Sequence, residues 1–295
     1  MKSYIIITDN TCDLEPSFYK EHNIPVIMLP YSIDDVVYGP DNDMAIKEFY
    51  DSIRNGKMPT TMAANPEAYT STFKKYLDEG LDVLYLAFSS ALSSSCSNAI
   101  LAANELNEEY KDVSVTVIDT LCASMGEGLL LYKAVQAKEA GKTLQEVIDY
   151  VESTKLKICH YFTVNDLHHL HRGGRVSKAT AIVGTLINVK PVLHVPDDGS
   201  LVSLCNVRGR KKSLNTLISY MKAHVKNPSR DDVVMIAHGD CIEDANYVAE
   251  EVKKEFGIEN IIISYASQTI GSHTGPGLIA LFFEGDSRHI EDKYK

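Results

Sequence analysis

The sequence lacks the motifs by which nucleotide-dependent and zinc-dependent enzymes are usually recognised. There is no GxxxxGK[ST] loop to cradle nucleotide phosphates, and no GxGxxG follows the first predicted strand. There is also no HExxH, and none of the six cysteines forms a CxxC pair. We therefore expect no zinc site of a familiar type and interpret the scattered cysteines as reduced, buried thiols of a cytoplasmic protein.

Long apolar runs and an excess of positive charge are absent as well. No segment approaches the roughly 20 apolar residues that span a bilayer, and the run Ile5–Ile7 is too short for a signal peptide. The formal net charge of −11 argues against general binding of nucleic acids, which requires a basic surface. We expect a cytoplasmic protein without a nucleic-acid partner, whose contact with membranes is transient at most.

Apolar and helical segments alternate through the first half of the 295-residue chain. Strands are predicted at residues 4–8, 25–29, 82–88 and 113–119, with helices between them. This alternation is typical of a parallel sheet with covering helices, and ligands bind at the carboxyl ends of such strands. Polar residues follow three of the strands, and we expect these three strand ends to face one crevice.

The pattern changes in the second half. A helical region over residues 124–154 is interrupted near Gly141 and Thr143, which are typical of a helix end and a new N-cap. A turn at 196–199 predicts a hairpin of residues 190–195 and 201–207. We predict an α/β protein with an N-terminal domain, residues 1–160, built on a parallel sheet, and a mixed α/β C-terminal domain, residues 161–295.

The serine-rich segment 89–97 lies between the predicted strand 82–88 and a helix predicted over 98–108. Free backbone N–H groups at a helix start favour an anion, so these hydroxyls are candidates for an anion site. One serine capping the helix, with the others solvated, explains the segment equally well.

Two other segments carry candidate ligands. Three glycines and a proline within residues 271–277 surround His273, which we expect to lie inside a turn and to face an anion or act as a base. The proline-bounded loop 58–66 contains Thr60 and Thr61, and Asn65 or a threonine is expected to cap a helix beginning near Pro66.

The histidines between residues 168 and 171 are candidates for a metal site. His168 and His171 are spaced as ligands on a short helix, but only Asp166 and Cys159 could complete the set, and a partly exposed helix end explains the pattern better. Arginines follow the helix at 172 and 175, where they could bind carboxylates or phosphates of a partner.

Together these segments resemble the DegV family of bacterial lipid-binding proteins. The matching residues run in order along nearly the whole chain: 8–14 (TDNTCDL), 59–61 (PTT), 89–93 (SSALS), 172–177 (RGGRVS), 186–192 (LINVKPV), 207–208 (VR) and 273–277 (HTGPG). The resemblance implies a two-domain DegV-like fold that buries a long-chain fatty acid, such as palmitate, stearate or oleate, between its domains.

The resemblance also implies a role for individual residues. By position, Thr61, Ser93 and His273 would bind the fatty-acid carboxylate, with additional head-group contacts from Thr60 and Thr274. The chain would be the lipid-binding subunit of a fatty acid kinase system that serves phospholipid synthesis. A separate catalytic subunit, which binds ATP and would be contacted by Arg175 and Arg208, would convert the carboxylate to an acyl-phosphate. No catalysis by this chain, no metal and no other cofactor is expected.

The sequence departs from the family pattern at Met62, where serine is usual, and at Ser94, where glycine is usual. An alternative function is a serine esterase or acyltransferase with Ser93 as nucleophile and His273 as base. Asp9 or Asp119 would then orient the histidine. The GxSxG elbow of such enzymes is absent around Ser93.

Overall fold

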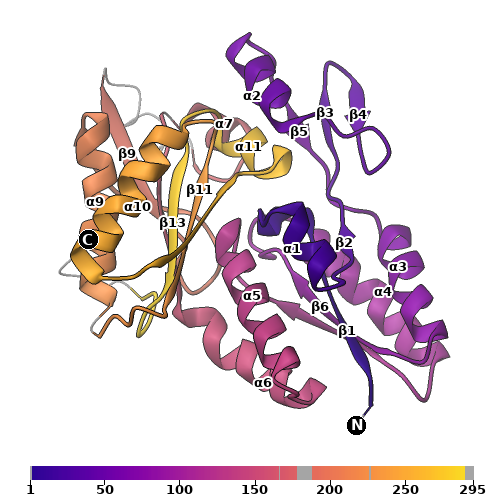
Figure 1. Ribbon diagram of the computed structural model, residues 1–295. Helices are drawn as coiled ribbons and strands as arrows, with labels where there is room; N and C mark the ends of the chain where they lie inside the picture. The colour runs from indigo at the N-terminus through magenta and orange to yellow at the C-terminus, as the bar shows by residue number, and fades with distance from the viewer. Residues whose placement is uncertain (1, 166, 178–187, 226, 290–295) are drawn as a thin grey trace.

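The computed structural model describes residues 2–165, 167–177, 188–225 and 227–289. Two β-sheets with their covering helices stand side by side, and helix α5 lies between them (Figure 1). Asp166 and residues 186–187 of the motifs above lie outside the described residues. None of the described helices is both long enough and apolar enough to cross a membrane.

The first sheet is fully parallel, with the strand order β2-β1-β6-β7. Its strands are β1 (Tyr4–Asp9), β2 (Val26–Ile27), β6 (Asp82–Ala87) and β7 (Val115–Asp119). Every residue of β6 is buried, as the apolar run in its sequence predicts. Helices α3 (Pro66–Asp78) and α4 (Ser95–Glu109) pack beside this sheet, and the Asn65 side chain caps α3 by accepting a hydrogen bond from the Ala68 N–H. The predicted parallel sheet is confirmed.

The second sheet is mixed, with the order β10-β9-β8-β13-β11-β12. Its strands are β8 (Ile158–Thr163), β9 (Val189–His194), β10 (Val202–Arg208), β11 (Val233–His238), β12 (Asn260–Tyr265) and β13 (Ile279–Glu284). The predicted hairpin is the antiparallel pair β9–β10. β8 pairs with β13 along its whole length, so the predicted domain boundary after residue 160 lies within a strand of this sheet. Helices α9 (Arg210–His224) and α10 (Ile242–Phe256) cover its outer side (Figure 1).

A small antiparallel sheet, β4-β3-β5, stands apart from the two large ones. It consists of β3 (Tyr31–Ile33), β4 (Val36–Tyr38) and β5 (Thr60–Thr61), next to helix α2 (Ile46–Arg54). The paired threonines were predicted in a loop, and the structure corrects this, because Thr61 pairs with Tyr31 in β5. The remaining short helices are η1 (Asn10–Cys12), α1 (Pro16–Glu21), η2 (Lys155–Lys157), α7 (His168–Arg172) and α11 (Gln268–Thr274).

Helix α5 (Met125–Glu139) contacts β6 and η1 on one side and β8, β11 and β13 on the other. Two glycines of α5 allow the helix to approach both sides this closely. A Cβ atom at Gly126 would lie 2.1 Å from Nε2 of His160, and one at Gly128 would lie 2.5 Å from the Cys12 carbonyl oxygen. The break predicted after α5 is confirmed, since α6 (Leu144–Thr154) begins at a capping box of Thr143 and Glu146.

Glu127 of α5 is completely buried against the end of β1. Its Oε2 lies 2.8 Å from Oγ1 of Thr11, and that hydroxyl is also hydrogen-bonded to Asp9. One hydroxyl proton cannot serve two carboxylate acceptors at once. Burial, and after it the nearby charge of Asp9, raises the pKa of Glu127 well above its usual value and so favours its neutral form. We expect a protonated Glu127 that donates to the Thr11 hydroxyl, whose own proton is then free for Asp9.

A Glu127→Gln variant tests this protonation. Because the folded-state pKa is raised, the stabilisation from protonated Glu127 is complete below pH 4.5 and is lost as the pH rises above that value. Glutamine keeps a neutral donor, so the variant should equal the wild type at pH 4 and exceed its stability at pH 8. Urea unfolding at both pH values measures this. Glu127→Ala, the control, should lose about 1–3 kcal/mol at pH 4, because it removes the hydrogen bond. Equal pH slopes for wild type and Gln variant would contradict the assignment.

Candidate functional site

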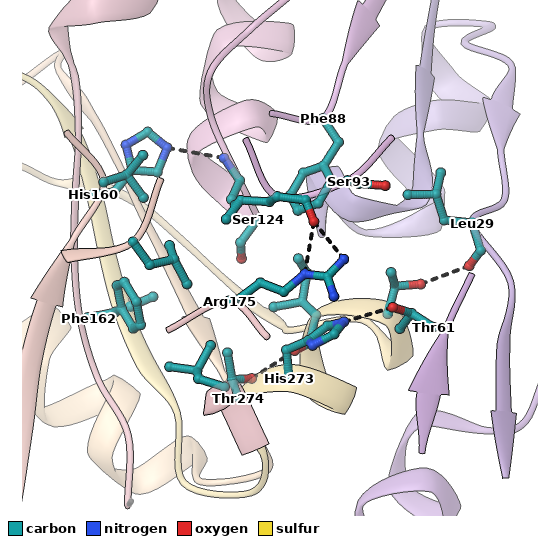
Figure 2. Close-up of a pocket in the computed structure, with 18 of the residues that line it drawn as sticks. Leu29, Thr61, Phe88, Ser93, Ser124, His160, Phe162, Arg175, His273 and Thr274 are labelled. Carbon is teal, nitrogen blue, oxygen red and sulfur yellow. Dashed lines mark hydrogen bonds between the residues drawn. The ribbon is translucent and has the colours of Figure 1, made fainter. Parts of the chain in front are cut away.

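A pocket lies between the two halves of the protein and is lined by residues of both (Figure 2). The lining residues of the first half are Leu29, Thr61, Met62, Ala63, Phe88, Leu92, Ser93, Ser94, Ala123 and Ser124. Those of the second half are His160, Phe162, Leu170, Arg175, Val195, Leu201, Thr269, Ile270, His273, Thr274, Leu278, Ala280 and Phe282. Most of the wall is aliphatic or aromatic. Thr61, Ser93, Arg175 and His273 form a polar group, which we call the polar end of the pocket.

Thr61 and His273 face each other at the polar end (Figure 2). Oγ1 of Thr61 and Nε2 of His273 are 2.7 Å apart. Burial, followed by the charges of Arg175 and Arg172, lowers the pKa of His273 to about 4, so its ring is neutral at physiological pH. A neutral imidazole and a hydroxyl carry one proton each, and their shared hydrogen bond uses one of them. One donor of the pair is therefore left for a ligand.

The position of His273 corrects the prediction that it lies inside a glycine turn. It lies in the last turn of helix α11, which Ser267 caps by accepting a hydrogen bond from the Ile270 N–H. The turn comes later, at Gly275, whose φ of 70° ends the helix. Another glycine makes room for the ring, because a Cβ atom at Gly173 would lie 2.1 Å from Nδ1 of His273.

The sequence allows two roles for a serine of this segment, capping a helix or lining an anion site, and Ser93 has both. Its Oγ accepts a hydrogen bond from the Ser95 N–H at 3.2 Å, at the start of α4, and the residue also lines the pocket. Helix α4 begins at Ser95, three residues before the predicted start at Asn98. Ser94 is exposed and lines the pocket as well. The Ser93 hydroxyl also donates to the Ser95 hydroxyl at 3.0 Å, a bond that an acceptor atom of a ligand would replace.

Arg175 is half-buried in the pocket wall. Its Nε and Nη2 donate to the carbonyl oxygen of Leu92 at 2.9 and 2.7 Å (Figure 2). Its Nη1 donates to the Gly173 carbonyl. Burial lowers the pKa of this guanidinium. These bonds hold the loop before Ser93 against the loop after α7.

The other predicted site residues are placed differently. The Thr274 hydroxyl donates to the Ile270 carbonyl at 3.0 Å, although the residue lines the pocket. Thr60 alternates with Thr61 along β5, and its hydroxyl pairs with that of Ser32 at 2.9 Å, away from the lining residues. Arg208 is exposed at the end of β10. The polar end therefore gathers Thr61, Ser93, Arg175 and His273, and not Thr60 or Arg208.

Asp9 and Asp119, the carboxylates considered as orienting groups of an esterase, accept hydrogen bonds from backbone N–H groups instead. Asp9 accepts from the Tyr85 hydroxyl and the Phe88 N–H, and Asp119 accepts from the N–H groups of Ser90 and Leu121. Neither contacts His273, whose partner is Thr61. Of the three polar strand ends expected to face one crevice, the segments after β6 and β7 line the pocket, with Ser93 and Ser94 from the first and Ser124 from the second. The segment directly after β1 supplies no lining residue.

The histidines weighed as metal ligands lie on or next to α7, at the predicted short helix. Within the described ranges, no group of three or more His, Cys, Asp or Glu side chains is arranged to hold a metal ion. The described cysteines are all free thiols, four of them buried.

An apolar pocket between two α/β layers, with hydroxyl and imidazole donors at one end, defines a protein class that holds an apolar ligand by a small polar group. A sequence model described as "Uncharacterised protein, DegV family" matches residues 3–286. A DegV domain-containing protein of Clostridium perfringens is 41% identical over 98% of this chain and 99% of its own length. The chain belongs to the DegV family.

Solved structures share the fold. A DegV family protein of Thermus thermophilus, described by its fatty acid binding, aligns with a TM-score of 0.86 and 27% identity over 96% of this chain and 99% of its own. The Fak B3 protein of a Streptococcus pneumoniae fatty acid kinase, loaded with linoleic acid, aligns with a TM-score of 0.83 over 96% of this chain and 100% of its own, at 23% identity. The predicted DegV-like α/β fold, with a parallel sheet and a mixed sheet, is confirmed.

The neutrality of His273 can be measured directly. We expect its imidazole to titrate near pH 4, because burial and Arg175 disfavour the charged ring. Since this pKa lies below the unfolded value of about 6.5, the associated stability is lost as the pH falls from 6.5 toward 4. Long-range ¹H–¹⁵N NMR, assigned with a His273→Gln variant, gives the titration curve. Arg175→Ala should raise the pKa, and a wild-type midpoint near 6.5 would contradict the buried geometry.

Proposed function

We propose that this protein binds a long-chain fatty acid in the pocket, with the carboxylate held by Thr61, Ser93 and His273. The observation that carries the proposal is the donor left over by the Thr61–His273 pair, in a pocket whose wall is mostly aliphatic or aromatic. A carboxylate accepts such a hydrogen bond, and an acyl chain fits the aliphatic and aromatic wall. The family relative of Thermus thermophilus, described by its fatty acid binding, supports this ligand class.

The energetics favour a carboxylate bound by neutral donors. About 14 to 16 buried methylenes at roughly 0.8 kcal/mol each contribute on the order of 11–13 kcal/mol, before the cost of ordering the ligand. The head group then needs orientation more than binding energy. Because Arg175 is engaged with the Leu92 and Gly173 carbonyls, the carboxylate oxygens stay open to a further reaction.

That reaction, in the second part of the proposal, is phosphorylation by a separate kinase subunit in the cytoplasm. The γ-phosphoryl group of ATP would be transferred to a carboxylate oxygen, forming an acyl-phosphate for phospholipid synthesis and releasing ADP. Support comes from the motif resemblance and from the absence of a GxxxxGK[ST] loop and of a GxGxxG after the first strand. Arg208, which is exposed, is the proposed partner contact, and Arg175 is proposed to contribute from the pocket wall.

The lipid-binding proposal is tested by extraction and by mutation. Purified protein should release a long-chain fatty acid that mass spectrometry detects after denaturation, and added oleate should raise the melting temperature. The double variant Thr61→Ala/Ser93→Ala should bind oleate about ten- to hundredfold more weakly, because two hydroxyl contacts to a charged group are lost.

The matched control is Ser90→Ala/Ser97→Ala, which removes two exposed serine hydroxyls from the same segment, outside the pocket lining. It should bind oleate as the wild type does. Lipid-free preparations that do not respond to oleate would refute the proposal. Wild-type affinity in the Thr61/Ser93 variant would place the head group elsewhere.

The kinase step is tested by charge reversal at Arg208. With a fatty acid kinase catalytic subunit, ATP and oleate, Arg208→Glu should reduce acyl-phosphate formation about tenfold or more, because a contact charge is inverted. Its oleate affinity should stay unchanged. Arg230→Glu, an exposed arginine in the turn before β11, is the control and should keep full phosphorylation. Equal rates for both variants would exclude Arg208 as a contact.

A further inference from the structure

Helix α11, which carries His273, is only seven residues long. So short a helix has little stability of its own, and its position depends on the contacts made by the rest of the chain. His273 lies six residues after Ser267, about 9 Å along the helix axis. A small rotation at the N-terminus of α11 would therefore separate His273 from Thr61. What holds this N-terminus decides the geometry of the polar end.

Asp13 holds Ser267, the residue immediately before helix α11. Its Oδ1 accepts the Ser267 N–H at 2.9 Å, and its Oδ2 accepts the Ser124 hydroxyl at 2.5 Å. Asp13 is 4% exposed and has a φ of 56°, in the left-handed region. Its carboxylate thus joins three segments that are distant in sequence: the loop after β1, the start of α5 and the start of α11.

Asn10 makes a second link from the same loop. Its Nδ2 donates to Oγ1 of Thr269 at 3.1 Å, and its Oδ1 accepts the Leu29 N–H at 2.8 Å. The Thr269 hydroxyl in turn donates to the Leu29 carbonyl at 3.0 Å. The three residues form a closed set of hydrogen bonds in which the first turn of α11 is tied to the strand end after β2. Leu29 and Thr269 both line the pocket.

The middle of α11 is fitted closely to the same half of the protein. A Cβ atom at Gly271 would lie 2.7 Å from the Tyr50 hydroxyl oxygen, and that hydroxyl donates to the Ala266 carbonyl at 2.8 Å. These contacts restrict how far α11 can approach α2. They do not fix its rotation as the directional bonds to Asp13 and Asn10 do.

We propose that Asp13 and Asn10 are positioning residues for the fatty-acid site: through the N-terminal turn of α11 they fix His273 against Thr61. The inference rests on the proposed function, because its main readout is fatty-acid affinity. Neither residue lines the pocket or has a direct role in holding the ligand. Their effect on binding should therefore pass through His273.

The chain offers an isosteric test of this role. An asparagine at position 13 can accept the Ser267 N–H with Oδ1 and donate to the Ser124 hydroxyl with Nδ2. Burial raises the pKa of Asp13 to about 7, so the site already tolerates an uncharged side chain. Asp13→Asn should keep oleate affinity within about threefold, whereas Asp13→Ala should weaken it about ten- to hundredfold.

The matched control is Asp82→Ala. Asp82 is also a buried carboxylate that accepts a backbone N–H, from Ser114 at 2.8 Å, but it lies at the other end of β6. Its loss should lower the melting temperature without changing oleate affinity. A purely structural role for Asp13 would give the same result, and a positioning role would not.

A double-mutant cycle identifies the route of the effect. In a His273→Ala background, Asp13→Ala should cause no further loss of oleate affinity, since both variants remove the same contact. Should Asp13→Ala fail to fold, Asn10→Ala replaces it in the cycle, with the same expected pattern. The NMR signal of His273 in the ligand-free protein should shift in Asp13→Ala and stay in place in Asp13→Asn.

Three results would overturn the inference: wild-type oleate affinity in folded Asp13→Ala, an equal loss in Asp13→Asn, or a full additional loss in the His273→Ala background. Failure of the wild type to bind oleate would instead reject the proposed function. The His273 signal of the ligand-free variants would then decide the positioning role alone, and an unchanged signal in Asp13→Ala would reject it.

Discussion

The structure depends on how closely helix α5 fits between the two large sheets. Gly126 leaves room for the His160 ring of β8, and Gly128 leaves room for the Cys12 carbonyl of η1. A side chain at either position would push one sheet away from the helix. Because the pocket is lined from both halves, the distance set by these glycines also sets its width. The site is therefore a consequence of the interface and could not form in either half alone.

The carboxylates around this interface hold backbone groups in place and are not arranged for catalysis. Asp9 holds the end of β6 through the Phe88 N–H, Asp119 holds the loop after it through Ser90, and Asp13 reaches across to Ser267. Asp9 and Asp13 are buried, and a buried carboxylate is costly unless its acceptors are used. Each of the three carboxylates accepts a hydrogen bond from a segment other than its own. A network of this kind specifies one arrangement of strand ends, whereas apolar contacts alone would allow several.

The sequence predicted the features that depend on local patterns. Strand β6 follows from its apolar run, α3 from Asn65 and Pro66, and the break before α6 from Gly141 and Thr143. Strands β3, β4 and β5 have two or three residues each, too few for a period to be visible. The pairing of Thr61 with His273 spans 212 positions and has no local signal. Local patterns marked both segments as candidates, but only the family resemblance assigned the two residues to one site, and it carried no information on the helix that holds His273.

The same distinction explains why Arg175 differs from its sequence-based interpretation. From the sequence alone, an arginine after two glycines is interpreted as a surface group that binds an anion, because the sequence does not show which groups accept its hydrogen bonds. In the structure, its N–H groups are directed at the Leu92 and Gly173 carbonyls. Its charge still lowers the pKa of His273, which keeps the imidazole neutral. A bound carboxylate would thus meet neutral donors close to a guanidinium whose hydrogen bonds are already in use. That combination orients an anion without clamping it, as a protein requires if it is to hold a substrate for another enzyme.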